Sequence, residues 1–159
     1  MIGNDGAVAS RPNEIVVGWY DADDHYLGRS VASVPSLAAG MSWFAVVEHR
    51  EAFEVAEFEA TVRGQQADSA LPEVVTIEEY TLDEARPGVT GLCANTRETS
   101  VPLTLTASVY RSSWLSHTGS ASATIPAATT WRFLIRLENV DGEDASLGDD
   151  VRFFARGGE

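Results

Sequence analysis

The stretch IVVGWYDADDHYLGRSV, residues 15–31, places two short apolar and aromatic runs on either side of an acidic turn. Short runs rich in Val, Ile and aromatic residues, separated by Gly, Asp and Asn, are typical of strands joined by turns. The first run ends in Trp19 and Tyr20, and the turn gathers acidic residues beside His25. The stretch therefore predicts a β-hairpin whose turn is the strongest candidate for chemistry in the chain.

The rest of the chain continues this pattern, and helical periodicity is nearly absent. Residues 54–62 alternate in the manner of a strand, although their Ala and Glu content leaves a short helix as the alternative. About ten strands at intervals of roughly 8–12 residues predict an all-β fold, a β-sandwich rather than a barrel or an α/β fold. The expected strands cover residues 15–21, 25–34, 41–49, 54–62, 73–82, 88–95, 101–110, 120–125, 130–138 and 151–156.

Three landmarks recur about 90 residues later along the chain, which indicates a tandem duplication. Asn4 is matched by Asn95, Tyr20 by Tyr110, and SLAAGMSWF (36–44) by TIPAATTWRF (124–133). The polar segment RGQQADSALP (63–72) marks the boundary, which gives modules of residues 1–66 and 67–159. The second module starts with EVVTIEEYTLDEARPG, whereas only MIG precedes Asn4, so the first module is expected to lack its N-terminal strand.

The charge balance excludes several classes of partner. The 159 residues carry 24 Asp plus Glu against 11 basic residues, all arginine, for a net charge of −13. This charge argues against binding to nucleic acid and to anionic membrane surfaces. Self-repulsion destabilises such a fold in dilute buffer, and salt relieves it because the Debye length falls to about 3 Å at 1 M. We therefore expect a halophilic archaeon as the source, with a GC-rich bacterium as the alternative.

Other composition features remove whole reaction types. Without lysine there is no phosphate-binding P-loop and no Schiff-base or pyridoxal-phosphate chemistry. Cys93 is the only cysteine, which excludes an intrachain disulfide and predicts a small buried thiol on a strand rather than a nucleophile. No run approaches 18 apolar residues and the N-terminus lacks the features of a signal peptide, so we expect a soluble chain without direct membrane insertion.

With these landmarks in place, the chain resembles two copies of the FxLYD domain, a small immunoglobulin-like β-sandwich module of prokaryotic surface proteins and lipoproteins. The first half supplies VVGWYD, SLAAG and WFAVV, and the second supplies GLCAN, LTASVYR, IPAATT and WRFLIRL. Val17 and Ala107 replace the signature phenylalanine, and Arg111 replaces the signature aspartate of the second copy. The resemblance implies two tandem immunoglobulin-like modules, no enzyme activity, and an envelope-associated role in binding or spacing.

The acidic turn is a candidate cation site. Asp21, Asp23 and Asp24 begin like the D-x-D of a calcium loop. However, Tyr26 and Ala32 stand where such a loop needs glycine and glutamate. The corresponding place in the second half reads YRSSW, without a carboxylate. We therefore interpret the stretch as a structural turn, with a weak surface Ca²⁺ site as the alternative.

Histidines and tryptophans give the remaining candidates. His25, His49 and His117 lie outside any metal-ligand spacing, and no G-x-S-x-G motif is present, so we expect no enzyme. A zinc site built from the three histidines remains an alternative. Trp43 and Trp131 occupy matching positions and are expected in the core. Trp114, in a predicted hairpin turn, is the aromatic residue for which exposure is best supported, able to stack on a sugar or contact a protein, unless it folds back over the sandwich.

These observations predict a non-enzymatic, salt-adapted β-sandwich protein. We expect it to be extracellular or attached to the cell envelope, with a cytoplasmic location as the alternative, and to bind a protein or glycan partner. A cation- or carbohydrate-binding module is one alternative function, and a divergent hydrolase on a sandwich scaffold is another. The exposed edge strands of a sandwich are also general sites for pairing between modules.

Overall fold

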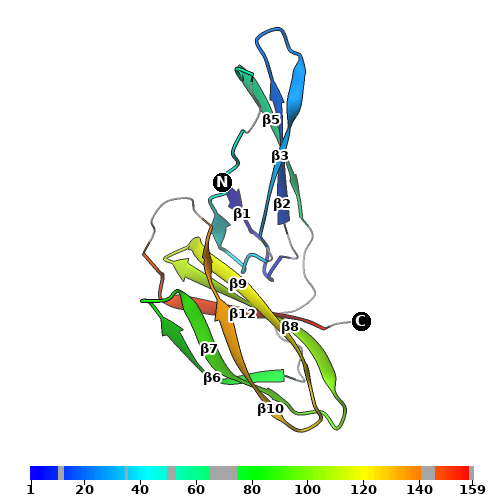
Figure 1. Ribbon diagram of the computed structural model, residues 1–159, viewed down its shortest axis with the longest axis vertical. Coiled ribbons are helices and arrows are strands. Elements are labelled where there is room, and N and C mark those ends of the chain that lie inside the picture. The colour runs from blue at the N-terminus through cyan, green and yellow to red at the C-terminus, as the bar shows by residue number, and fades with distance from the viewer. Residues whose placement is uncertain (11–12, 35, 50–52, 65–74, 141–145, 158–159) are drawn as a thin grey trace.

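The computed structural model describes residues 1–10, 13–34, 36–49, 53–64, 75–140 and 146–157. Within these residues the regular elements are β-strands and no helix occurs, which confirms the predicted all-β class (Figure 1). The segment for which a helix was the alternative is a strand, β5. The strands are β1 Ile2–Gly3, β2 Asn13–Tyr20, β3 Tyr26–Val34, β4 Ser42–Trp43, β5 Glu57–Arg63, β6 Val75–Asp83, β7 Gly88–Asn95, β8 Val101–Arg111, β9 Trp114–Ile125, β10 Thr130–Arg136, β11 Glu138–Asn139 and β12 Asp150–Gly157.

Two sheets, formed mainly by strands of the second half, pack face to face as a β-sandwich (Figure 1). One sheet has the order β10-β7-β6, and the other runs β1-β4-β9-β8-β12 with β11 paired to β9. Strand β8 directs Leu103, Leu105 and Val109 into the core because alternate side chains of a strand share one face. They meet Phe133 and Ile135 from the opposite sheet.

Cys93 lies on β7 in this same core and is fully buried. The predicted buried thiol on a strand is therefore confirmed. Burial raises the pKa of the Cys93 thiol, because the charged thiolate loses its hydration in an apolar core. A thiol held neutral and away from solvent has the properties of a packing residue rather than a nucleophile.

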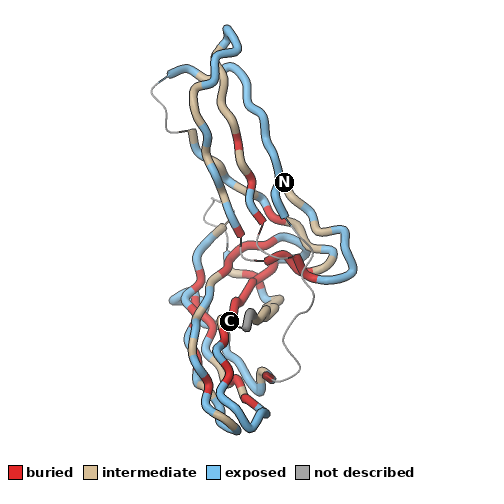
Figure 2. The backbone as a smooth tube through the Cα atoms, turned by 90° about the vertical axis from the view of Figure 1, so that its right-hand side faces the viewer, coloured by how far each residue is buried: buried red, intermediate tan, exposed pale blue. Residues whose placement is uncertain are grey.

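The first half presents a three-stranded sheet, β3-β2-β5, which projects away from the sandwich (Figure 1). Ile15 and Val17 of β2 point to its buried face, where they join Val34, Leu37 and Trp43 in a second core cluster. Figure 2 shows how this buried stripe is confined to the middle of the projecting sheet and to its base.

The strand predicted for residues 41–49 is wrong in extent. Only Ser42–Trp43 form a strand, and the chain then crosses the face of the β2–β3 hairpin without joining a sheet. Ser30 Oγ accepts from Trp19 Nε1 at 2.9 Å and donates to the Glu48 carbonyl at 2.8 Å, which ties this crossing segment to the hairpin. The apolar run covers a neighbouring sheet instead of extending β4, because tertiary packing outweighs the local strand propensity of these residues.

The two halves share a sheet and a core. Strand β4 pairs in parallel with β9, so β1 and β4 extend the sheet of the second half. Tyr110 and Leu115, from the second half, belong to the core cluster that contains Ile15 and Val17. The Tyr110 hydroxyl accepts a hydrogen bond from the Ala38 amide at 3.0 Å. The core of the first half is therefore completed by side chains of the second.

Strand pairing also corresponds between the halves. In the first half, β2 pairs with both β3 and β5. In the second half, β8 pairs in the same way with β9 and β12, and all four pairings are antiparallel. Likewise β1 pairs with β4, and β7 pairs with β10. Strand β6 has no counterpart among the described residues of the first half.

Asn4 and Asn95 make matching hydrogen bonds. Each donates from Nδ2 to the carbonyl four residues later at 2.9 Å, and each accepts at Oδ1 from the amide two residues later at 3.0 Å. Each also donates to the turn that follows the hairpin, at Leu37 or Pro126. These shared contacts agree with a duplication. The division into residues 1–66 and 67–159 stays a prediction, because its boundary lies among residues outside the described part.

Candidate functional site

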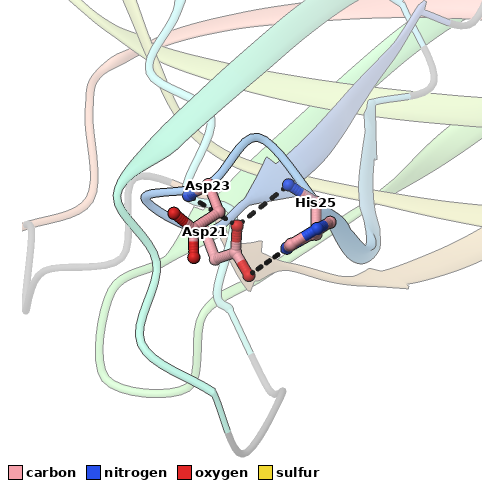
Figure 3. Close-up of side chains that lie close together, drawn as sticks. All are labelled: Asp21, Asp23 and His25. Atoms are coloured by element: carbon pink, nitrogen blue, oxygen red, sulfur yellow. Dashed lines mark hydrogen bonds and ion pairs between the residues drawn. The ribbon is translucent and has the colours of Figure 1, made fainter.

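The turn between β2 and β3 is held by the carboxylate of Asp21 (Figure 3). Asp21 Oδ1 accepts from the amides of Asp23 and His25, both at 2.9 Å, and Oδ2 lies 3.1 Å from His25 Nδ1. An aspartate that accepts from the amide two residues later forms a turn by itself. Asp24 completes the reversal with a left-handed φ of 63°. This geometry supports the structural interpretation of the acidic turn.

The same hydrogen bonds fix the charge of Asp21. The His25 backbone N–H holds the pKa of the Asp21 carboxyl below its ordinary value, because it stabilises the charged form. The nearby imidazole acts in the same direction. Asp21 is therefore an ionised acceptor, without the raised pKa that a general acid needs near neutral pH.

The structure gathers a different metal-ligand set from the predicted one. Asp21, Asp23 and His25 each offer a ligand atom, and these atoms lie within 4.8 Å of one another (Figure 3). Asp24 is exposed and stands outside this group. Ca²⁺ requires six to eight oxygen ligands, whereas this group supplies two carboxylates and an imidazole nitrogen. Nitrogen with oxygen suits a transition metal better than Ca²⁺, and both oxygens of Asp21 already accept hydrogen bonds.

The three histidines lie on different elements. His25 is on the exposed turn, and His49 lies on the crossing segment with its ring edge against Trp19, 5.3 Å between centroids. His117 is buried on β9. Of the described His, Cys, Asp and Glu side chains, the group that could hold a metal contains His25 alone among the histidines. The structure does not bring together the predicted three-histidine zinc site.

Trp114 is exposed, as predicted, but it lies on strand β9 and not in the turn, and Phe44, Tyr26 and Phe58 are more exposed. It opens β9 with 40% of its surface exposed, and its ring lies 6.1 Å from that of Phe44, which is 55% exposed. Trp43 is buried, as expected, and its Nε1 donates to the Val140 carbonyl at 3.4 Å. Trp131 is only half-buried and tilts against the core. The Phe44–Trp114 pair is thus an exposed aromatic surface.

A groove of about 660 Å³, which the sequence did not indicate, lies where the two halves meet. It is lined by hydroxyl groups, by one guanidinium and one carboxylate, and by apolar side chains: Ser33, Val34, Thr118, Gly119, Ser120, Leu134, Arg136, Glu138 and Val140. Such a lining can hydrogen-bond a polar ligand, and none of the three histidines belongs to it. Its residues come from strands far apart in sequence, so no local pattern could reveal it.

Comparisons of the chain with known protein families, with curated proteins and with solved structures found no match. The part of the chain that the structure describes contains no helix long and apolar enough to cross a membrane.

Proposed function

We propose that the chain is a non-enzymatic, salt-adapted β-sandwich protein of the cell envelope, built from two FxLYD-like modules that bind or space other molecules. The observation that carries this proposal is the matched framework of the two halves. Strand pairing corresponds, and Asn4 and Asn95 hold equivalent turns through the same hydrogen bonds. A structural module that is copied within a chain is typical of proteins that extend or present surfaces.

The candidate catalytic groups support the same proposal. The Asp21 carboxylate is occupied in closing its own turn, and Cys93 is buried with a raised pKa. The shared sheet through β4 and β9 joins the modules through backbone pairing. Modules joined in this way hold a defined distance between the projecting sheet and the sandwich, as a spacer requires.

The envelope location is tested with the full-length gene product in its source cells. Cells are treated with an external protease and then fractionated, and a cytoplasmic enzyme serves as the control for cell integrity. We expect the protein to be cut from outside while the cytoplasmic enzyme stays intact. Complete protection in intact cells, with recovery only in the cytoplasmic fraction, contradicts the envelope part of the proposal.

The Phe44–Trp114 pair favours carbohydrate binding as a second candidate function. Exposed aromatic rings that lie together provide a surface on which sugar rings stack. A glycan array probed with the protein tests this. We expect a signal that Trp114→Ala abolishes and that Tyr26→Ala, which removes an exposed aromatic on the projecting hairpin, leaves unchanged. If glycan binding persists in Trp114→Ala, the glycan does not bind at the Phe44–Trp114 pair.

A further inference from the structure

Among the described strands longer than two residues, β5 is the one in which every residue is exposed. All of its residues, Glu57–Arg63, are exposed, and it ends the sheet order β3-β2-β5. Among the described residues it pairs with β2 along one side only, and Figure 2 shows the pale-blue strand on the outer edge of the projecting sheet. An unpaired edge offers a row of backbone donors and acceptors to another strand. EFEATVR contains neither proline nor lysine, two residues that commonly protect such edges.

The two faces of β5 differ in chemistry. Phe58, Ala60 and Val62 lie on the same face as the β2 core residues, as the registers of Phe58 with Trp19 and Val62 with Ile15 show. Phe58, whose ring lies 6.2 Å from that of Trp19, is 68% exposed and Val62 is 54% exposed, so the described residues leave most of this apolar edge open. The corresponding strand of the second half, β12, instead packs its Phe153 against Tyr80 and Phe133 of the opposite sheet.

The sequence of β5 is complementary to itself when two copies run antiparallel. With Ala60 opposite Ala60 of a second copy, Glu57 lies opposite Arg63 of that copy and Phe58 opposite its Val62. Residues directly opposite in an antiparallel pair have Cβ atoms about 4.5–5.5 Å apart, and opposite charges at that distance attract. The pairing therefore places two ion pairs on the polar face and apolar contacts on the other.

Other edge strands lack this combination. The opposite edge of the same sheet, β3, carries Arg29 as its only charge, and the charges of β6 are all acidic. The edge strand β12 has both signs, but its Asp150 is already bound by Arg152 at 2.9 Å. Complementary charge and full exposure thus coincide on β5.

We propose that two copies of this chain pair antiparallel through β5, with Ala60 at the two-fold axis. The two projecting sheets then form one continuous sheet with a shared apolar face. A two-fold interface repeats every contact, so each Glu57–Arg63 pair occurs twice. Each chain carries a net charge of −13, so added salt favours the dimer by screening the general repulsion, while the ion pairs select the register.

Disulfide trapping tests the register directly. Opposed Cα atoms in an antiparallel pair lie about 4.5–5.5 Å apart, within the range that a disulfide spans. Under mild oxidation we expect Ala60→Cys to give a covalent dimer and Thr61→Cys, whose opposite residue is Glu59, to give far less. The native Cys93 is 0% exposed and contributes no background. No covalent dimer, or equal yields from the two variants, overturns the proposal.

Charge reversal tests the ion pairs. By sedimentation equilibrium, at about 0.15 M and about 1 M KCl, we expect Glu57→Arg and Arg63→Glu each to weaken dimerisation roughly tenfold, because like charges then face each other. An equimolar mixture of the two variants should recover the affinity, since each reversed residue faces its opposite charge in the other variant. Arg29→Glu, with the same charge change on β3, should have no effect.

A wild-type chain that stays monomeric up to roughly 1 mM at both salt concentrations overturns the proposal. A mixture that fails to recover the affinity overturns the Glu57–Arg63 pairing. Circular dichroism confirms that the variants are folded, and the disulfide experiment does not depend on either charge variant.

Discussion

The hydroxyl of Tyr110 gives the sharpest test of how the two halves are joined. Tyr110 is fully buried, and its hydroxyl accepts from the amide of Ala38, itself only 3% exposed, at 3.0 Å. Tyr110→Phe keeps the ring in place and removes the hydroxyl, which accepts from the Ala38 amide and also hydrogen-bonds the Ser108 side chain. The Ala38 amide is then left buried without that partner, and it cannot turn to water without disturbing the core.

An unsatisfied buried donor costs about 1–3 kcal/mol. The free energy of unfolding should fall by this amount, and Tm should fall by about 2–4 °C for each kcal/mol in a chain of this size. The ring contact with the Arg152 guanidinium, 5.7 Å from the ring centroid, is retained, so the loss in stability reports the hydrogen bonds of the hydroxyl, and exchange of the Ala38 amide reports the bond between the halves. Burial also raises the pKa of the Tyr110 phenol, which keeps the hydroxyl neutral.

Urea denaturation followed by tryptophan fluorescence measures this change at fixed salt. Tyr20→Phe is the matched control, because Tyr20 holds the corresponding position in the first half, is only half-buried and keeps its ring contact with Tyr26. We expect the control to stay within about 0.5 kcal/mol of the wild type. Exchange of the Ala38 amide with solvent, measured by NMR, should speed up in Tyr110→Phe alone. Equal stability of the two variants refutes the proposed link.

Three further predictions address the turn and the charge. The pKa of Asp21 is lowered in the folded chain, so its stabilising effect is present above about pH 3.9 and is lost as the pH falls through the folded pKa. The difference in Tm between the wild type and Asp21→Asn should therefore shrink below about pH 4, and a constant difference contradicts this. Calorimetry with Ca²⁺ at high KCl should show any heat disappearing with Asp23→Ala but persisting with Asp149→Ala, and heat that survives Asp23→Ala excludes the turn as the site. Finally, Tm should rise from dilute buffer to about 1 M KCl, and equal values in both argue against salt adaptation.

Local patterns predicted the hairpins and several single residues correctly. The runs at residues 15–34 form β2–β3 as predicted, and β8 with β9 forms the second hairpin, but β9 begins at Trp114 and not at residue 120, so the predicted turn was too long. Cys93 is buried and Trp114 is exposed, as expected from their immediate neighbours. The hairpins depend on neighbouring residues, whereas the burial of Cys93 depends on strands β8 and β10, and Trp114 lies against the distant Phe44.

The features that were missed depend on distant partners. Residues 44–49 have a strand-like sequence, but they cover the hairpin instead of pairing with a strand. The hydrogen bonds that run from Trp19 through Ser30 to the Glu48 carbonyl hold them there. The parallel pairing of β4 with β9 and the groove between the halves have no local signal. At the turn, Asp24 has a left-handed backbone and stands outside the group of possible ligands, whereas His25 belongs to that group.

The contribution of Tyr110 and Leu115 to the core of the first half bears on synthesis at the ribosome. Domains generally fold as units and N-terminal first during translation, at about 5–20 residues per second. Here the N-terminal half leaves the ribosome before residues 110–115 are synthesised, so its core cannot form completely until Tyr110 and Leu115 are available. The sandwich of the C-terminal half has a separate core, so it can fold as soon as its own residues have been synthesised. The nascent chain should therefore acquire its structure from the C-terminal half backwards, with the projecting hairpin the last part to become protected from protease.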